Sequence, residues 1–340
     1  MSERFKHSVK TALAIVLAYG LALWFDWDRP MWAAFAVALI SMPTLEASLG
    51  KGGQRLWGTA LATFVALSLI ALFAQDRWQF MFAQAAWLAF CAYQMINSRK
   101  AYLWFCAGFV SSIITANGGP DPVNAFSIAT IRTLETALGV ICFAVVFSLL
   151  WPVREDATAG AQPADVQAVP NARRLNQAVR VFIAYCTAFL LVIYVPGFPG
   201  AHSILGMLAP FAIILANTPQ LSADKLINPF VLAILISSPI YLFLMPKLGG
   251  FAQLGVVIFF ACFTISYLLH KPEQALGRTF GLAFFAVVTG ISNDQSYSFI
   301  ALTTTILMFC LTLLILHAIS AIQVFRVEDD AMVGKTAEST

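Results

Sequence analysis

Arg132 and Glu135 are the residues whose types and spacing most directly suggest chemistry. They lie in an apolar stretch, and a spacing of three places both side chains on one face of a helix, about one turn apart. A charge inside a membrane helix costs roughly 3 kcal/mol on insertion scales, so such residues usually face a protein interior or a water-filled path. Arg132 would attract an anionic group, and Glu135 would orient that group or take up a proton. Two structural alternatives stay open: the pair neutralises itself, or Arg132 extends to the membrane surface.

Prolines that interrupt apolar segments mark a second candidate site. Pro43 and Thr44 come after only 12 residues of the second expected span, with Glu46 still inside that span, and Pro210 and Pro219 interrupt the matching segment of the second half. Backbone groups freed at interrupted segments can line a transport cavity. The alternative is that these prolines end short helices at the cytoplasmic surface.

The sequence contains no motif of a soluble enzyme. It has no phosphate-binding GxxxxGK[ST] loop, no HExxH, no GxSxG and no His/Cys set with metal spacing, and its four His and six Cys are scattered. We therefore expect no enzymatic activity, cofactor, metal site or nucleic-acid partner.

The composition indicates which elements must position these residues. Hydrophobic residues make up 60% of the 340 residues and charged residues 11%, whereas soluble domains have about 25% charged residues. Because a membrane helix needs about 20 apolar residues, we expect an all-α membrane protein of about 12 transmembrane helices in the lipid bilayer. The expected spans are 5–25, 31–48, 55–74, 78–96, 101–117 and 126–151, followed by 175–195, 202–219, 228–246, 250–269, 275–292 and 297–325.

The distribution of Lys and Arg predicts the orientation. With a cytoplasmic N-terminus, 16 of the 20 Lys and Arg residues fall in cytoplasmic segments; Arg29, Arg77 and Lys247 fall in outside loops, and Arg132 lies within a span. Positive charges accumulate on the cytoplasmic side of membrane proteins. Both termini are therefore expected in the cytoplasm.

The sequence also indicates two tandem halves. Residues 42–48 (MPTLEAS) are similar to residues 218–224 (TPQLSAD), and each segment closes the second span of its half. Because each half has an even number of spans, we expect two parallel six-helix repeats related by a pseudo-two-fold axis along the membrane normal. The expected boundaries are 1–152 and 173–326 for the repeats, 153–172 for a cytoplasmic linker and 327–340 for a cytoplasmic tail.

Two segments resemble a known family. Residues 41–59 are similar to the "P…G..R..GT" segment of the fusaric acid resistance (FUSC-like) and aromatic acid exporter proteins, with Arg55 as its arginine. Residues 132–152 are similar to the RxxExxxG…P helix of that family, with Arg132 and Glu135 as its charged pair. The second half matches in layout only and lacks the pair.

The resemblance implies an inner-membrane efflux component of Gram-negative bacteria that exports aromatic carboxylic acids or related toxic compounds. Such proteins often work with a periplasmic adaptor and an outer-membrane channel. Many carry a large cytoplasmic domain between the membrane halves, so this chain would be a compact form.

The leading hypothesis is a proton-coupled secondary transporter, or antiporter, that exports small organic anions. Arg132 would contact the anion, and Glu135 or Glu46 would be the coupling acid. A passive organic-anion channel is the first alternative, and a membrane scaffold for an efflux adaptor is the second; a homo-oligomer stays open. The residues expected at the translocation site are Arg132, Glu135, Glu46, Arg55, Pro43, Thr44 and Pro219.

Overall fold

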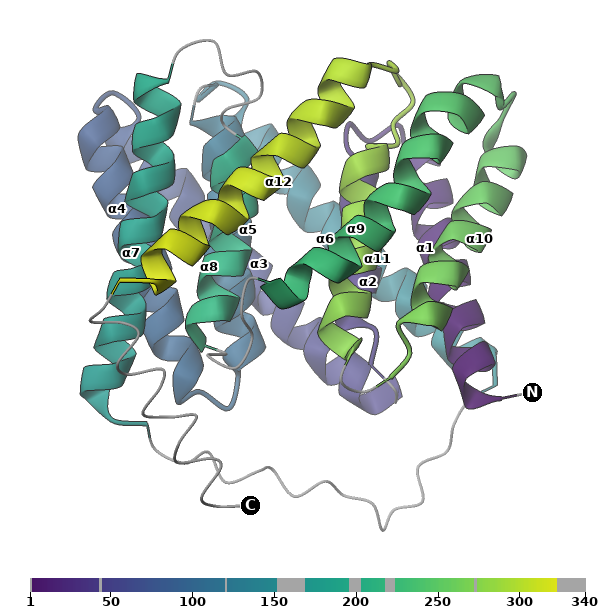
Figure 1. The fold of residues 1–340 in the computed structure, drawn as a ribbon, viewed down its shortest axis with the longest axis horizontal. Helices are drawn as coiled ribbons and strands as arrows, with labels where there is room; N and C mark the ends of the chain where they lie inside the picture. The colour runs from purple at the N-terminus through teal and green to yellow at the C-terminus, as the bar shows by residue number, and fades with distance from the viewer. Residues whose placement is uncertain are drawn as a thin grey trace. The chain divides into compact units, whose positions relative to one another are not determined.

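The computed structural model describes residues 2–42, 45–119, 121–151, 169–195, 203–217, 224–271 and 274–322. Within these ranges every regular element is a helix, as the composition predicts, and no strand occurs (Figure 1). The first six helices are α1 (Glu3–Trp24), α2 (Met31–Ile40), α3 (Leu45–Phe73), α4 (Arg77–Ile96), α5 (Ala101–Gly118) and α6 (Ala125–Leu149). The next six are α7 (Asn171–Tyr194), α8 (Ser203–Asn217), α9 (Asp224–Pro239), α10 (Phe251–Leu268), α11 (Ala275–Thr289) and α12 (Phe299–Ser320). A π-helical turn, Ile240–Leu244, and a 3-10 turn, Met245–Lys247, continue α9.

Eight of the helices in the described ranges are long and apolar enough to cross a membrane. They are α1, α3, α5, α6, α7, α9 with its continuation, α10 and α12. α8 and α11 have 15 residues each, so they extend about 22 Å, less than the roughly 30 Å of a bilayer core. α2, with 10 residues, is shorter still. The described chain thus contains the apolar helices of a multi-pass membrane protein, while twelve complete spans remain a prediction.

The second expected span, 31–48, is too long. α2 ends at Ile40, and Ser41 is already extended with a ψ of 101°. A proline disfavours the helical conformation at the residue before it, so helices usually end near that point. α3 begins at Leu45, earlier than expected, and Glu46 therefore lies in the first turn of α3 instead of the second span.

The prediction that Pro210 interrupts the second half's matching segment is wrong. α8 runs from Ser203 to Asn217 with Pro210 inside it. Proline removes one backbone hydrogen bond and crowds the carbonyl of the residue four positions earlier, here Gly206. α8 packs against α5 and α7, and neighbouring helices compensate for such a loss inside membrane proteins. Pro219 lies outside the described residues.

The chain forms two compact units, and each draws on both halves of the sequence. In unit 1, α1 packs against α10, and α2 packs against α11; in unit 2, α7 packs against α4, and α8 packs against α5 (Figure 1). α3 contributes its residues up to Leu56 to unit 1 and the rest to unit 2. Unit 1 comprises residues 1–56, 131–161 and 224–303, and unit 2 comprises 57–130, 162–223 and 304–340.

The buried faces of corresponding helices recur at a constant distance in the sequence. Seven buried positions of α1 recur in α7 170 residues later, and five buried positions of α4 recur in α10 174 residues later. A shared buried register means that each helix of a pair presents the same face to its neighbours. The α1 positions are Ser8, Lys10, Thr11, Ala14, Ile15, Ala18 and Tyr19; the α4 positions are Met81, Gln84, Leu88, Cys91 and Ala92.

The glycines of the two family-like motifs lie where helices approach closely. A Cβ added at Gly139 of α6 would lie 2.3 Å from the carbonyl oxygen of Ala33 on α2. A Cβ added at Gly58 of α3 would lie 2.6 Å from the carbonyl oxygen of Leu103 on α5. No side chain fits at either contact without moving the backbone, so each glycine sets the distance between two helices.

The contact at Gly139 predicts that Gly139→Ala lowers the free energy of unfolding by about 1–3 kcal/mol, the usual effect of overpacking. The measurement is thermal unfolding of the purified protein in detergent. Gly53→Ala is the matched control, because nothing lies within 4 Å of a Cβ at Gly53, and alanine favours a helix by about 1 kcal/mol over glycine. Equal Tm values for the two variants would refute the close approach of α6 and α2.

Candidate functional site

Arg132 and Glu135 form an ion pair inside unit 1. Nη1 of Arg132 lies 3.2 Å from Oε2 of Glu135, and the two side chains are 6% and 1% exposed. The two residues meet on one face of α6, as their spacing of three predicts. Arg132 packs within the protein and does not face the surrounding lipid.

Two aromatic residues of α2 lie between the guanidinium groups of Arg132 and Arg55. The guanidinium carbon of Arg132 lies 3.8 Å from the centre of the Trp32 ring, and the Trp32 and Phe35 ring centres are 5.2 Å apart. The guanidinium carbon of Arg55 lies 5.9 Å from the Phe35 ring. An arginine above an aromatic face is attracted by the ring quadrupole, more strongly where water is excluded. The result is a row of arginine, two rings and arginine, which we call the Arg–aromatic row (Arg132, Trp32, Phe35, Arg55).

The charges around the pair are mostly positive. Arg29 and Arg55 both lie within electrostatic range of Arg132, while Asp28 and Arg29 lie within range of Glu135. Three arginines and two carboxylates give this group a formal net charge of +1, which favours a monovalent anion.

The pair also retains unused hydrogen-bonding capacity. Nε of Arg132 and Oε1 of Glu135 are buried without a hydrogen-bond partner among the described residues. A buried charged group that is not fully hydrogen-bonded is costly, and such atoms are found at catalytic sites and where water or ions bind. Chemically, Arg132 can donate to an incoming carboxylate, and Glu135 can accept a proton.

Of the other expected site residues, only Arg55 joins this group. Arg55 is 2% exposed, and the structure places it in the Arg–aromatic row. Glu46 is exposed in the first turn of α3, nine residues before Arg55 and so roughly 13 Å away along the helix axis. Pro43, Thr44 and Pro219 lie outside the described residues. The expectation that Glu46 and the prolines belong to the site remains a prediction.

Sequence reasoning missed the aromatic members of the row. The position of Trp32 near the end of an expected span instead favours a place in the interfacial aromatic belt. The signal that could have found it is the spacing of three between Trp32 and Phe35, which places both rings on one face of the short helix α2.

A buried polar chain lies near the start of α1, also in unit 1. The hydroxyl oxygens of Thr11 and Ser41 are 3.0 Å apart, and Ser41 Oγ lies 3.3 Å from Nε2 of His7. Lys10 donates to the carbonyl oxygen of Trp151 at 2.6 Å.

No group of three or more His, Cys, Asp and Glu residues in the described ranges could hold a metal ion.

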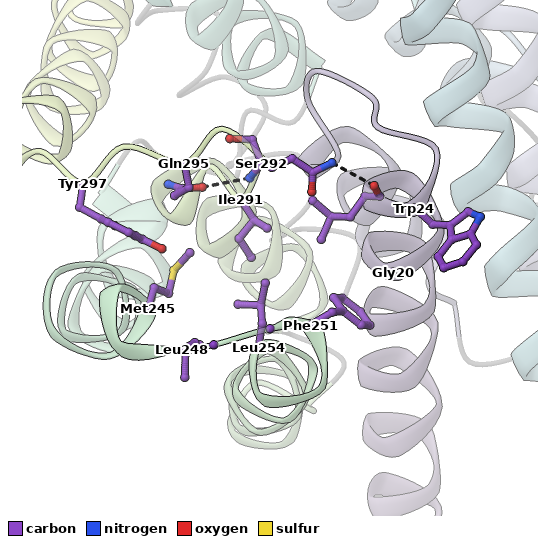
Figure 2. Close-up of a pocket in the computed structure, with 14 residues that line it drawn as sticks. Gly20, Trp24, Met245, Leu248, Phe251, Leu254, Ile291, Ser292, Gln295 and Tyr297 are labelled. Atoms are coloured by element: carbon purple, nitrogen blue, oxygen red, sulfur yellow. Dashed lines mark hydrogen bonds between the residues drawn. The ribbon is translucent and has the colours of Figure 1, made fainter.

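A cavity of about 580 Å³ lies at the ends of α1, α10 and α11 in unit 1. Figure 2 shows Tyr297 and Met245 on one side of it and Phe251 toward α1, while the ring of Trp24 points away. Its polar groups bond one another: the Ser292 N–H donates to Gln295 Oε1 at 2.9 Å. The lining contains no Asp, Glu, Lys, Arg or His, so it is neutral.

The charged pair lies in the part of the chain that matches the profile of a known protein family. The profile of the Fusaric acid resistance protein family matches residues 4–179 of the chain, which include Arg55, Arg132 and Glu135. No solved structure matches.

Curated relatives match over a little less than half of the chain. The "Uncharacterized transporter YdhK" of Escherichia coli (strain K12) is 28% identical over 160 residues, which cover 46% of this chain and 24% of the relative. The "p-hydroxybenzoic acid efflux pump subunit AaeB" of Enterobacter cloacae is 27% identical over 164 residues, covering 45% of this chain and 25% of the relative. The matched region thus spans about a quarter of each relative's length.

The buried ion pair predicts strong coupling between its two members. Arg132→Met or Glu135→Gln alone leaves one buried group without its partner and should lower the free energy of unfolding by about 3 kcal/mol. The double variant removes both charges, so its loss should be smaller than the sum by at least about 1 kcal/mol. Thermal unfolding of the four proteins in detergent measures this cycle. Strictly additive losses would show that the two side chains do not interact.

Proposed function

Because the chain belongs to the fusaric acid resistance protein family, we propose that it exports small organic anions, such as aromatic carboxylates, across the bacterial inner membrane. A relative named as a p-hydroxybenzoic acid efflux pump subunit supports this substrate class. The proposal includes coupling to protons, in which Glu135 is the acid that gains and loses the proton.

The observation that carries the proposal is the buried Arg132–Glu135 pair at the end of the Arg–aromatic row. It offers a guanidinium for the carboxylate of the substrate, and the rings of Trp32 and Phe35 provide faces on which an aromatic ring can stack. The net positive charge of the group opposes the desolvation cost of a bound anion.

Glu135 and the substrate carboxylate compete for the same guanidinium. While Glu135 is ionised, it occupies Arg132; once Glu135 is protonated, its hold on Arg132 weakens and the guanidinium becomes available to the anion. Proton binding and anion binding are thereby linked at one pair of side chains. The direction of a pH gradient that accelerates transport then reveals whether the proton moves with the substrate or against it.

The arrangement of the chain is part of the same proposal. The recurrence of the buried faces of α1 in α7 and of α4 in α10 supports two parallel six-helix repeats. The excess of Lys and Arg in alternate loops supports cytoplasmic termini. By analogy with a relative named as a pump subunit, we propose that the chain works with a periplasmic adaptor and an outer-membrane channel.

The test is efflux of p-hydroxybenzoate from proteoliposomes that contain the purified chain, with no pH gradient and with a gradient in either direction. We expect one gradient to accelerate efflux, and we expect Arg132→Gln to lower the initial rate at least about tenfold, because a charge-assisted hydrogen bond is lost. Glu135→Gln should remove the response to the gradient.

Arg99→Gln is the matched control, because Arg99 is exposed and lies outside the site; its rate should equal that of the wild type. Equal efflux rates without a gradient and with a gradient in either direction would eliminate proton coupling and favour a passive channel. Unchanged efflux in Arg132→Gln would eliminate the proposed anion site.

A further inference from the structure

Unit 2 contains a small cavity that the site described above does not use. It has a volume of about 140 Å³ and lies between the start of α4, the end of α5, α7 and the start of α8. These helices correspond to α10, α11, α1 and α2 of unit 1 in the order of the chain. The cavity is lined by Ala74, Arg77, Phe80, Thr115, Ala116, Gly119, Phe189 and Leu205.

The size and walls of this cavity suit one aromatic ring. An apolar protein cavity of about 150 Å³ stays dry and binds benzene. Phe80 and Phe189 form two of the walls, with ring centres 6.4 Å apart and planes tilted by 53°. Such a pair offers faces and edges at distances that aromatic contacts prefer. Gly119 leaves the space open, because a Cβ there would lie 3.2 Å from the Phe80 ring.

The charge at the cavity is positive. Arg77 is its one charged lining residue, and its side chain is exposed. Arg77 is the first residue of α4, where the helix dipole also favours an anion. The adjacent Asp76 does not line the cavity, because its carboxylate caps α4 by accepting from the N–H groups of Trp78 and Gln79.

The cavity of unit 1 provides the contrast. It lies at the ends of α1, α10 and α11, is about four times larger by the volumes of about 580 and 140 Å³, and has no charged residue in its lining (Figure 2). The corresponding helices thus build one neutral cavity and one cationic cavity. Only the cationic cavity combines a ring-sized space with a partner for a carboxylate.

We propose that the cavity at Arg77, Phe80 and Phe189 is a second binding site, which takes an aromatic carboxylate of one ring. The ring lies against the two phenylalanines and the carboxylate pairs with Arg77. In the proposed orientation Arg77 is on the outer side of the membrane. The choice of ligand rests on the proposed function; the existence of the site does not.

The test compares 4-fluorobenzoate with 4-fluorobenzamide, its neutral counterpart of the same shape, by ¹⁹F NMR titration of the full chain in detergent. To remove the first site, the titration is repeated on the double variant Arg132→Met with Glu135→Gln. In both proteins the benzoate should bind about tenfold more tightly than the benzamide. Arg77→Gln should abolish this difference, Arg77→Lys should keep most of it, and Ala74→Leu should weaken both ligands by narrowing the cavity.

Lys247→Gln is the control, since Lys247 is an exposed cation that lies beside the neutral cavity and lines neither of the two cavities. This variant should bind both ligands as the wild type does. The second site would be refuted if the affinity for benzoate were unchanged in Arg77→Gln and Ala74→Leu but lost in the Arg132/Glu135 double variant. That outcome would leave the proposed function intact. Benzoate binding that depends on Arg77, in a chain that does not transport p-hydroxybenzoate, would refute the proposed function and leave the second site intact.

Discussion

A positive and a negative charge held one helical turn apart in an apolar interior impose the main constraint on unit 1. Neither Arg132 nor Glu135 could be buried alone, since desolvating an isolated charge costs several kcal/mol. The surroundings follow from that need: Trp32 covers the guanidinium, and Gly139 lets α6 come close enough to α2 for this contact. The residues of the family-like motif RxxExxxG therefore act together, because the glycine makes the burial of the charged pair possible.

The sequence predicts this pair and its shared face because helical spacing is a local property. It also predicts the helical class of the fold and most helix boundaries within a few residues. It does not predict Trp32 and Phe35 as members of the site, because their role depends on which helix lies next to α2. The continuity of α8 through Pro210 likewise depends on tertiary contacts, which local patterns do not report. The end of α2, in contrast, follows a local effect of Pro43, which the expected span 31–48 did not take into account.

The corresponding helices of the two halves share buried registers but differ in chemistry. α1 and α7 bury the same seven positions, and Lys10 corresponds to Arg180, yet the first half alone carries the Arg132–Glu135 pair. The cavities differ in the same way, because Arg77 begins α4 whereas Phe251 begins α10. These helices thus share a packing pattern while their polar residues differ.

The interleaving of the halves has a consequence for how the protein is made. α1 and α2 pack against α10 and α11, and α4 and α5 pack against α7 and α8, so the helices synthesised first have their main partners in the part synthesised last. Until the second half has been inserted, the faces of α1 and α4 that pack against α10 and α7 lack these partners. Neither unit can therefore reach its final packing before the second half has been synthesised.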